Sequence, residues 1–117
     1  MKDSVLRTKS KEFAKTIILL CRKMKQNSTE SVLINQLLRS ATSVGANIHE
    51  AQYAQGTKDF ISKFEISLKE CNESEYWLEL LYETDSISKD EFTVLQMNCI
   101  ELRRMLVSSV SKLKNSL

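Results

Sequence analysis

The sequence contains no proline and only two glycines, Gly45 and Gly56, in 117 residues. Sheet-rich folds need frequent turn residues, so this scarcity excludes a fold made of many short strands. The longest apolar run, from Ile17 to Cys21, is far shorter than the roughly 20 residues that span a bilayer. The first residues also lack the apolar segment of a secretion signal. We therefore expect a cytoplasmic protein made of a few long helices, with no membrane partner.

Residues that carry catalysis or bind metals are also scarce. The only histidine is His49, and the helical pattern places it away from the core face. Cys21, Cys71 and Cys99 lie far apart, which fits neither a disulfide framework nor a zinc site, and each occupies an apolar-periodic position. Phosphate loops and the Glu-x-x-His spacing of di-iron bundles do not occur. The sequence thus predicts buried cysteines, a surface histidine, no cofactor, no metal and no enzyme.

Helical periodicity runs through almost the whole chain. Apolar residues recur at spacings of three and four within four segments, at about residues 5–26, 28–55, 58–84 and 89–114. Length and 42% apolar content suit a single domain over residues 1–117. Short connections and one apolar stripe on each helix predict an all-α fold, an up-down-up-down antiparallel four-helix bundle.

Capping signals set two of the expected helix starts. Asn27 followed by Glu30 predicts the start of the second helix, and Ser88 followed by Glu91 predicts the start of the fourth. The inward positions expected from the periodicity are Leu6, Phe13, Ile17, Leu20, Cys21 and Met24, then Leu33, Leu37, Ser40, Ala41, Val44, Ile48 and Ala51, then Phe60, Phe64, Ser67, Cys71, Ser74, Leu78 and Leu81, and finally Phe92, Leu95, Cys99, Leu102, Leu106, Val110 and Leu113.

The two glycines have different predicted roles. Gly56 is expected just past the second helix, in the left-handed conformation that satisfies the last carbonyls, with Thr57 as the cap of the third helix. Gly45 lies inside the second helix, where glycine costs up to about 1 kcal/mol relative to alanine. We therefore expect another backbone to come close to Gly45.

Charge is uneven along the chain although the net charge is only +2. Residues 1–26 contain eight Lys or Arg against two acids, whereas residues 57–87 contain eight acids against three Lys. The split fits two helices of opposite sign packed side by side, which we favour, or a basic partner-binding face. Lys11, Lys15 and Arg22 form a basic stripe on the outer side of the first helix. This stripe is either a solvated surface or a nucleic-acid-binding one.

The third helix is apolar on two sides. Ile66, Trp77 and Leu80 point nearly opposite to Cys71 on a wheel of 100° per residue. A helix with two apolar sides has two partners, so we expect these three residues at a subunit interface. Alternatively, Trp77 only covers a helix seam within one chain. The polar residues expected at the edge of the interface, where Arg39 would pair with Glu73 or Glu50, are Arg39, Ser43, Glu50 and Glu73.

Two stretches of the sequence also resemble a known family. The first contains QLLRS, TS, GANI and EA within residues 36–51, and the second contains KDFISK, LKE and ESEYWL within residues 58–78. They resemble the bacterial four-helix-bundle proteins called 23S rRNA intervening-sequence proteins. The resemblance extends from about Ser10 to Leu106, and it is most specific in the two central helices.

The resemblance implies a homo-oligomer, most often a pentamer, without known enzymatic activity and without an established catalytic residue. The family's relatives include the accessory variability determinant of diversity-generating retroelements, a basic five-fold barrel that contacts nucleic acid and a reverse transcriptase. A net charge of +2 is modest for binding phosphates. In a ring, however, the identical basic stripes of several copies would bind one nucleic acid together and raise the overall affinity. Tyr53 and the basic stripe do not form the aromatic-interleaved surface that binds single strands.

Two hypotheses follow for the function. The first is a non-enzymatic, homo-oligomeric four-helix-bundle protein that binds nucleic acid weakly through its first helix. Structured RNA is the nucleic acid we favour as its partner. The second is a protein–protein adaptor or scaffold without nucleic-acid binding. In that case the acidic side of the third helix, at Glu65, Glu79 and Glu83, or the ring itself would dock a basic protein partner.

Overall fold

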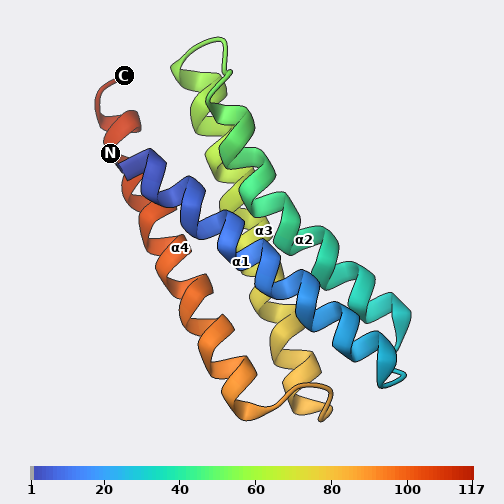
Figure 1. Ribbon diagram of the computed structural model, residues 1–117. Helices are drawn as coiled ribbons and strands as arrows, with labels where there is room; N and C mark the ends of the chain where they lie inside the picture. The colour runs from blue at the N-terminus through green and yellow to red at the C-terminus, as the bar shows by residue number, and fades with distance from the viewer. Residues whose placement is uncertain (1) are drawn as a thin grey trace.

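Four α-helices make up nearly all of the computed structural model, which describes residues 2–117, with side chains from Val5 onward (Figure 1). The helices are α1 (Lys2–Gln26), α2 (Ser31–Ala51), α3 (Thr57–Glu83) and α4 (Lys89–Asn115). Consecutive helices run antiparallel and are joined by short connections (Figure 1). The predicted four-helix bundle is confirmed. No helix in the described part of the chain has an apolar stretch long enough to span a bilayer.

The helices do not contact one another equally. α2 packs extensively on α3 and α3 on α4, whereas α1 packs on α2 and touches α4 least. Figure 1 shows α1 running diagonally, from beside the last turns of α4 to the first turns of α2. α1 and α3 therefore lie diagonally across the bundle. The favoured prediction, that the basic first helix packs beside the acidic third, is wrong because α1 has α2 and α4 as its neighbours.

The core follows the predicted pattern along most of its length. Every inward position predicted for α1 is buried, as are Phe64, Ser67, Cys71, Ser74, Leu78 and Leu81 in α3. Phe60, Phe92 and Leu113 are only half-buried because they lie near helix ends, where fewer neighbours cover them. In α2 the first inward position was predicted one residue too early, since Ile34 is buried and Leu33 is only half-buried.

Small residues allow α2 to approach both of its neighbours. A β-carbon added to Gly45 would lie 3.3 Å from the Ser10 hydroxyl oxygen and 3.5 Å from the Ser10 carbonyl oxygen. The close approach predicted at Gly45 is therefore confirmed, and the approaching helix is α1. On the α3 side, the Ser67 hydroxyl donates a 2.8 Å hydrogen bond to the carbonyl oxygen of Val44.

Left-handed residues that are not glycine end two helices. Ser28 follows α1 with a φ of 63°, and the N–H of Thr29 donates to the carbonyl oxygen of Met24 at 3.0 Å. Asp85, with a φ of 61°, ends α3 in the same way. This bonding pattern satisfies the last carbonyls of a helix and reverses the chain.

The predicted start of α2 is consequently wrong. Asn27 closes the end of α1, and Glu30 precedes α2 without a capping hydrogen bond from its side chain. The helix begins at Ser31. By contrast, the capping box of Ser88 and Glu91 at α4 is confirmed, with both reciprocal hydrogen bonds present.

The connection between α2 and α3 also differs from its prediction. α2 ends at Ala51, several residues before the predicted end at 55. Gly56 is extended, with φ 165° and ψ 177°, and it precedes α3 instead of closing α2. Thr57 is the first residue of α3 and provides no side-chain cap. The carboxylate of Asp59, in the first turn of α3, accepts a 3.2 Å hydrogen bond from the N–H of Gln55 in the connection.

Candidate functional site

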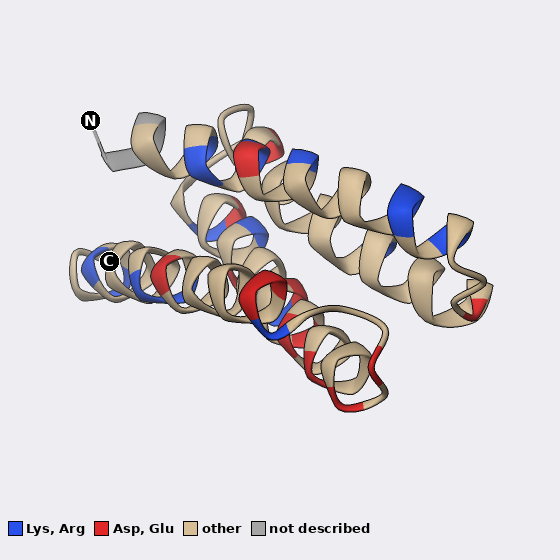
Figure 2. Ribbon diagram, turned by 60° about the horizontal axis from the view of Figure 1, so that its bottom comes forward, with Lys and Arg blue, Asp and Glu red and all other residues tan. Residues whose placement is uncertain are grey.

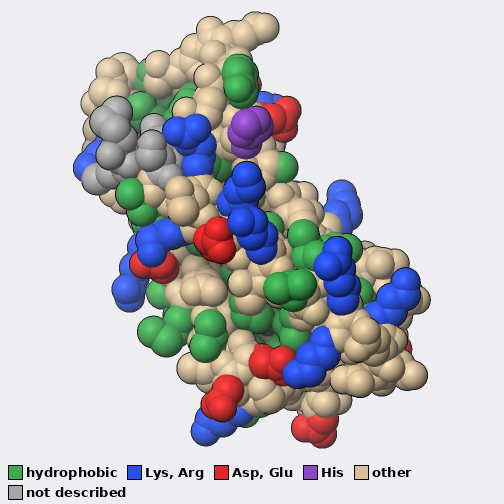
Figure 3. Space-filling model, in the orientation of Figure 1, with side chains coloured by type: hydrophobic (Ala, Val, Ile, Leu, Met, Phe, Trp, Pro, Cys, Tyr) green, Lys and Arg blue, Asp and Glu red, His purple; other side chains and the backbone are tan. Residues whose placement is uncertain are grey.

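The basic stripe lies on the outer surface of α1. Lys11, Lys15 and Arg22 are all exposed. Lys15 forms a 3.2 Å ion pair with Glu12, whereas neither Lys11 nor Arg22 is among the ion pairs found within 4 Å in the described chain. Figure 3 shows Lys and Arg side chains along the face that α1 covers. The stripe is therefore accessible to a partner from solvent.

Other cations of α1 form ion pairs with α4. Lys9 forms a 3.1 Å ion pair with Glu101, and Lys23 forms a 3.0 Å ion pair with Glu91, both on α4. The backbone N–H of Ser88 and the ammonium of Lys23 hold the pKa of Glu91 below its ordinary value. Helical spacing could not predict which cations of the first helix are paired, because their partners lie about seventy to ninety positions away.

The seven residues predicted at a subunit interface lie on the outer side of α2 and α3, and none is buried. They are Arg39, Ser43 and Glu50 on α2, and Ile66, Glu73, Trp77 and Leu80 on α3. Trp77 packs partly against the core, and its indole N–H donates to the Glu73 carboxylate at 3.3 Å. Tyr76, which the sequence analysis missed, is 54% exposed and meets Trp77 edge to face.

The pairing of Arg39 with Glu73 or Glu50 was predicted at the edge of an interface between copies, and it stays a prediction. No ion pair joins Arg39 to Glu73 or Glu50 in the part of the chain that is described. The charge of Arg39 also acts on Glu70. Burial and the neighbouring carboxylate of Glu73 raise the pKa of Glu70, and the charge of Arg39 partly opposes them.

A second exposed apolar surface lies between α1 and α4. A groove of about 470 Å³ opens there, lined by Thr16, Leu19, Leu20, Lys23, Asp90, Glu91, Val94 and Leu95. Leu19 and Val94 are 62% and 57% exposed, and Met97 beside them on α4 is 65% exposed. The sequence analysis missed this surface because Leu19 belongs to the continuous apolar run of the first helix.

Another groove, of about 720 Å³, lies between α1 and α2. Its lining residues are Arg7, Thr8, Ser10, Lys11 and Ala14 on α1 and Thr42, Gly45, Ala46 and His49 on α2. His49 is exposed, as predicted, and its ring meets the ring of Tyr53 edge to face at 5.6 Å. Figure 3 shows Lys and Arg side chains near the histidine and an acidic side chain directly beside it. This groove adjoins the basic stripe at Lys11.

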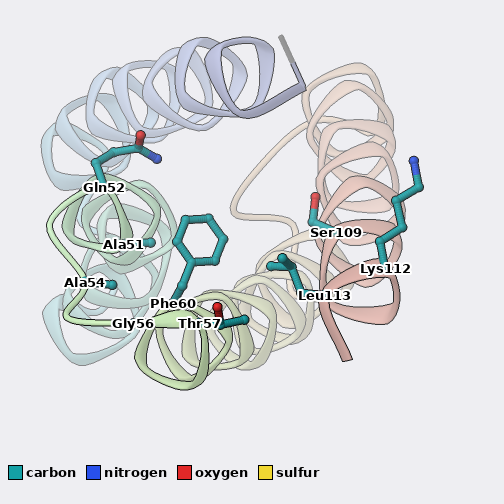
Figure 4. Close-up of a pocket in the computed structure, with 9 residues that line it drawn as sticks. All are labelled: Ala51, Gln52, Ala54, Gly56, Thr57, Phe60, Ser109, Lys112 and Leu113. Atoms are coloured by element: carbon teal, nitrogen blue, oxygen red, sulfur yellow. The ribbon is translucent and has the colours of Figure 1, made fainter. Parts of the chain in front are cut away.

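The open end of the bundle contains a cavity of about 600 Å³ (Figure 4). Phe60 and Leu113 point into it, whereas the side chain of Lys112 points away (Figure 4). Among the described residues that line the cavity, only Lys112 has a titratable side chain. General acid–base catalysis needs at least one positioned group that exchanges a proton near neutral pH, and an outward lysine does not fit that role.

The cysteines are buried, as predicted. Burial raises the pKa of the Cys21 thiol to about 11. Cys71 donates a 3.4 Å hydrogen bond to the carbonyl oxygen of Cys99, and contact with Cys71 together with burial raises the pKa of Cys99. Within the described residues, no three His, Cys, Asp or Glu side chains converge as a metal site would require.

Comparison with known proteins assigns the chain to a family. A family model described as 23S rRNA-intervening sequence protein matches residues 2–108. The chain belongs to this family. A solved structure similar to this chain is that of a protein with unknown function from the S23 ribosomal protein family of Bacteroides thetaiotaomicron. The two chains are 44% identical with a TM-score of 0.92, over 95% of this chain and 99% of the other.

Comparison of the chain with curated proteins gives no match. The family match confirms the resemblance seen over Ser10 to Leu106 and extends it toward both ends. Nothing in the described surfaces or in the comparisons points to catalysis. The features that remain for a function are surfaces: the basic stripe, the two apolar faces and the groove beside α1.

Proposed function

We propose that this protein is a non-enzymatic, cytoplasmic homo-oligomer that binds RNA weakly through the outer face of α1. The observation that carries the proposal is the exposure of Lys11 and Arg22 without an ion pair in the described chain. An anionic partner can approach these side chains without breaking any contact that stabilises the bundle. Phosphates neutralised by such cations release counterions, which provides most of the affinity for nucleic acid.

A single chain offers few such cations, so the affinity of one copy is low. Oligomerisation compensates, because identical stripes on one assembly act at a high effective concentration. The family resemblance implies five copies, and five stripes on one rim would bind a long RNA much more tightly than one stripe. The family's printed name, which refers to an intervening sequence of 23S rRNA, agrees with RNA as the partner.

Two apolar faces support self-association. The outer side of α2 and α3 carries Ile66, Tyr76 and Trp77, while the α1–α4 groove carries Leu19 and Val94. These faces lie on opposite edges of the bundle, because each pair of helices forms one edge. Two different patches that pair between neighbouring copies produce a closed ring when the rotation between copies allows it. A single patch would instead favour a twofold dimer.

Filter binding across a salt series tests the RNA proposal. The logarithm of the binding constant should fall steeply with the logarithm of salt concentration. Lys11→Gln and Arg22→Gln should each weaken binding and reduce the slope by roughly one unit at most. Lys9→Gln is the matched control because Lys9 is paired with Glu101. Absence of RNA retention at low salt would refute the proposal.

An adaptor function is the alternative. Glu79, Glu83 and Asp85 form no ion pair within the described chain. Figure 2 shows acidic residues gathered around the connection between α3 and α4. Glu65, which was predicted to share this docking face, is paired with Lys114. Co-purification from the native host separates the alternatives, since a basic protein recovered without nucleic acid would favour the adaptor.

A further inference from the structure

Cationic residues of α1 and a histidine of α2 line the groove between these two helices. Arg7 and Lys11 line it from α1, and His49 lines it from α2. Its floor consists of small residues around Gly45, where the two helices approach each other. None of the described residues that line the groove is acidic. The described lining therefore presents no negative charge to an anion in the groove.

The shape of the groove suits a linear anion. At 1.5 Å per residue, the α2 wall from Thr42 to His49 is about 10 Å long. That length exceeds a single phosphate group. Toward the C-terminal end of α1 the groove adjoins the basic stripe, which continues through Lys15 and Arg22. A chain of phosphates can thus follow the groove and continue along α1.

An exposed aromatic ring stands at the other end of the groove. Tyr53 is 76% exposed, and it follows His49 by one helical turn. The edge-to-face contact with His49 and a 2.9 Å hydrogen bond from its own N–H to the carbonyl oxygen of Glu50 fix its position. Cationic grooves that end on exposed aromatic rings bind unpaired nucleotides, because the phosphates meet the cations and a base stacks on the ring.

We propose that an unpaired segment of RNA lies in this groove, with phosphates beside Arg7 and Lys11 and one base stacked on Tyr53. This inference rests on the proposed function and specifies which part of an RNA is bound. A base inside a duplex is stacked on its neighbours and cannot reach Tyr53. A loop, bulge or single-stranded end presents such a base freely.

The test uses fluorescence anisotropy with a labelled single-stranded RNA of about 12 nucleotides, within the usual site sizes of single-strand-binding surfaces. A duplex of the same sequence is the second probe. Tyr53→Ala should weaken binding of the single strand by about fivefold or more, while Tyr53→Phe retains it because the ring remains. Neither change should affect binding of the duplex by more than about twofold.

Two charge-matched variants locate the phosphates. Lys11→Gln should weaken single-strand binding by about threefold to tenfold. Lys25→Gln removes the same charge from the exposed last turn of α1, outside the groove, and should change binding by less than about twofold. Equal effects of the two variants, or an unchanged affinity in Tyr53→Ala, would overturn the inference while leaving the proposed RNA function intact. A wild-type chain that binds neither probe would overturn both.

Discussion

The hydroxyl oxygen of Ser74 on α3 lies 2.9 Å from that of Ser40 on α2, and both side chains are buried. The Ser40 hydroxyl donates to the carbonyl oxygen of Leu37, so its oxygen can accept a hydrogen bond from Ser74. Serine at both positions keeps the two helices close without leaving a buried polar atom unpaired. This contact belongs to the most extensive helix pair in the bundle.

Substitution at Ser74 tests the importance of this close approach. Ser74→Leu should lower the free energy of unfolding by about 1–3 kcal/mol, because the larger side chain forces the helices apart. Ser74→Ala should cost less than about 1.5 kcal/mol, since Ser40 keeps its bond to Leu37. Urea denaturation measures both. Ser62→Leu, on the exposed side of α3, is the control and should change stability by less than about 0.5 kcal/mol.

The capping box of α4 should make a pH-dependent contribution. Ser88→Ala should destabilise the protein by about 1 kcal/mol at neutral pH, whereas Thr57→Ala, which removes no cap, should have little effect. The pKa of Glu91 is lowered in the folded state, so its contribution is present above the ordinary Glu pKa and is lost as pH falls through the folded value. The stability difference between wild type and Glu91→Gln should therefore shrink as the pH falls below the ordinary Glu pKa. A constant difference from neutral to acidic pH would contradict this account.

Self-association should depend on two different faces. Tyr76→Asp and Leu19→Asp should each reduce the sedimentation coefficient, because each places a charge in one of the two proposed contacts. Both positions are exposed in the single chain, so helicity measured by circular dichroism should be unchanged. Leu117→Asp, at the exposed chain end, is the control. If Tyr76→Asp alone dissociates the assembly, the contact is twofold and the ring proposal is wrong.

The three thiols should be inert in the folded protein. Burial raises the pKa of Cys21 to about 11, and Cys71 and Cys99 are fully buried. An aromatic disulfide reagent at about pH 8 should react with none of them until denaturant is added, because the buried sulfur atoms are out of its reach. Ser62→Cys provides a positive control because that position is exposed. Rapid reaction of the native wild-type chain would show that the core opens locally.

Most of the fold was predictable because helix burial is a local pattern. Phe13 and Ile17 are one helical turn apart, and their shared side of the helix faced the core as expected. The capping box of Ser88 was equally local and equally correct. The turn after α1 was not predictable from the usual glycine signal, since Ser28 adopts the left-handed conformation without one. Asn27 matched the pattern of a helix N-cap, but its backbone N–H instead donates to carbonyl oxygens at the end of α1.

The candidate surfaces were less predictable than the core. The basic stripe at Lys11 and Arg22 followed directly from helical spacing and is exposed as expected. Tyr53 was set apart from that stripe because it is about forty positions from Lys11 in the sequence. The packing of α1 on α2 brings His49 to the same groove as Lys11, with Tyr53 directly beside it.

The sequence by itself determined the four helices, the inward residues and the uneven charge, because these depend on residues three and four positions apart. Only the tertiary structure decided which helices are neighbours, and hence that Lys9 and Lys23 are paired with α4 while Lys11 is not. The physical reason is that an ion pair or a groove depends on distances between separate helices, which are set by how the helices pack and not by the spacing within any one of them.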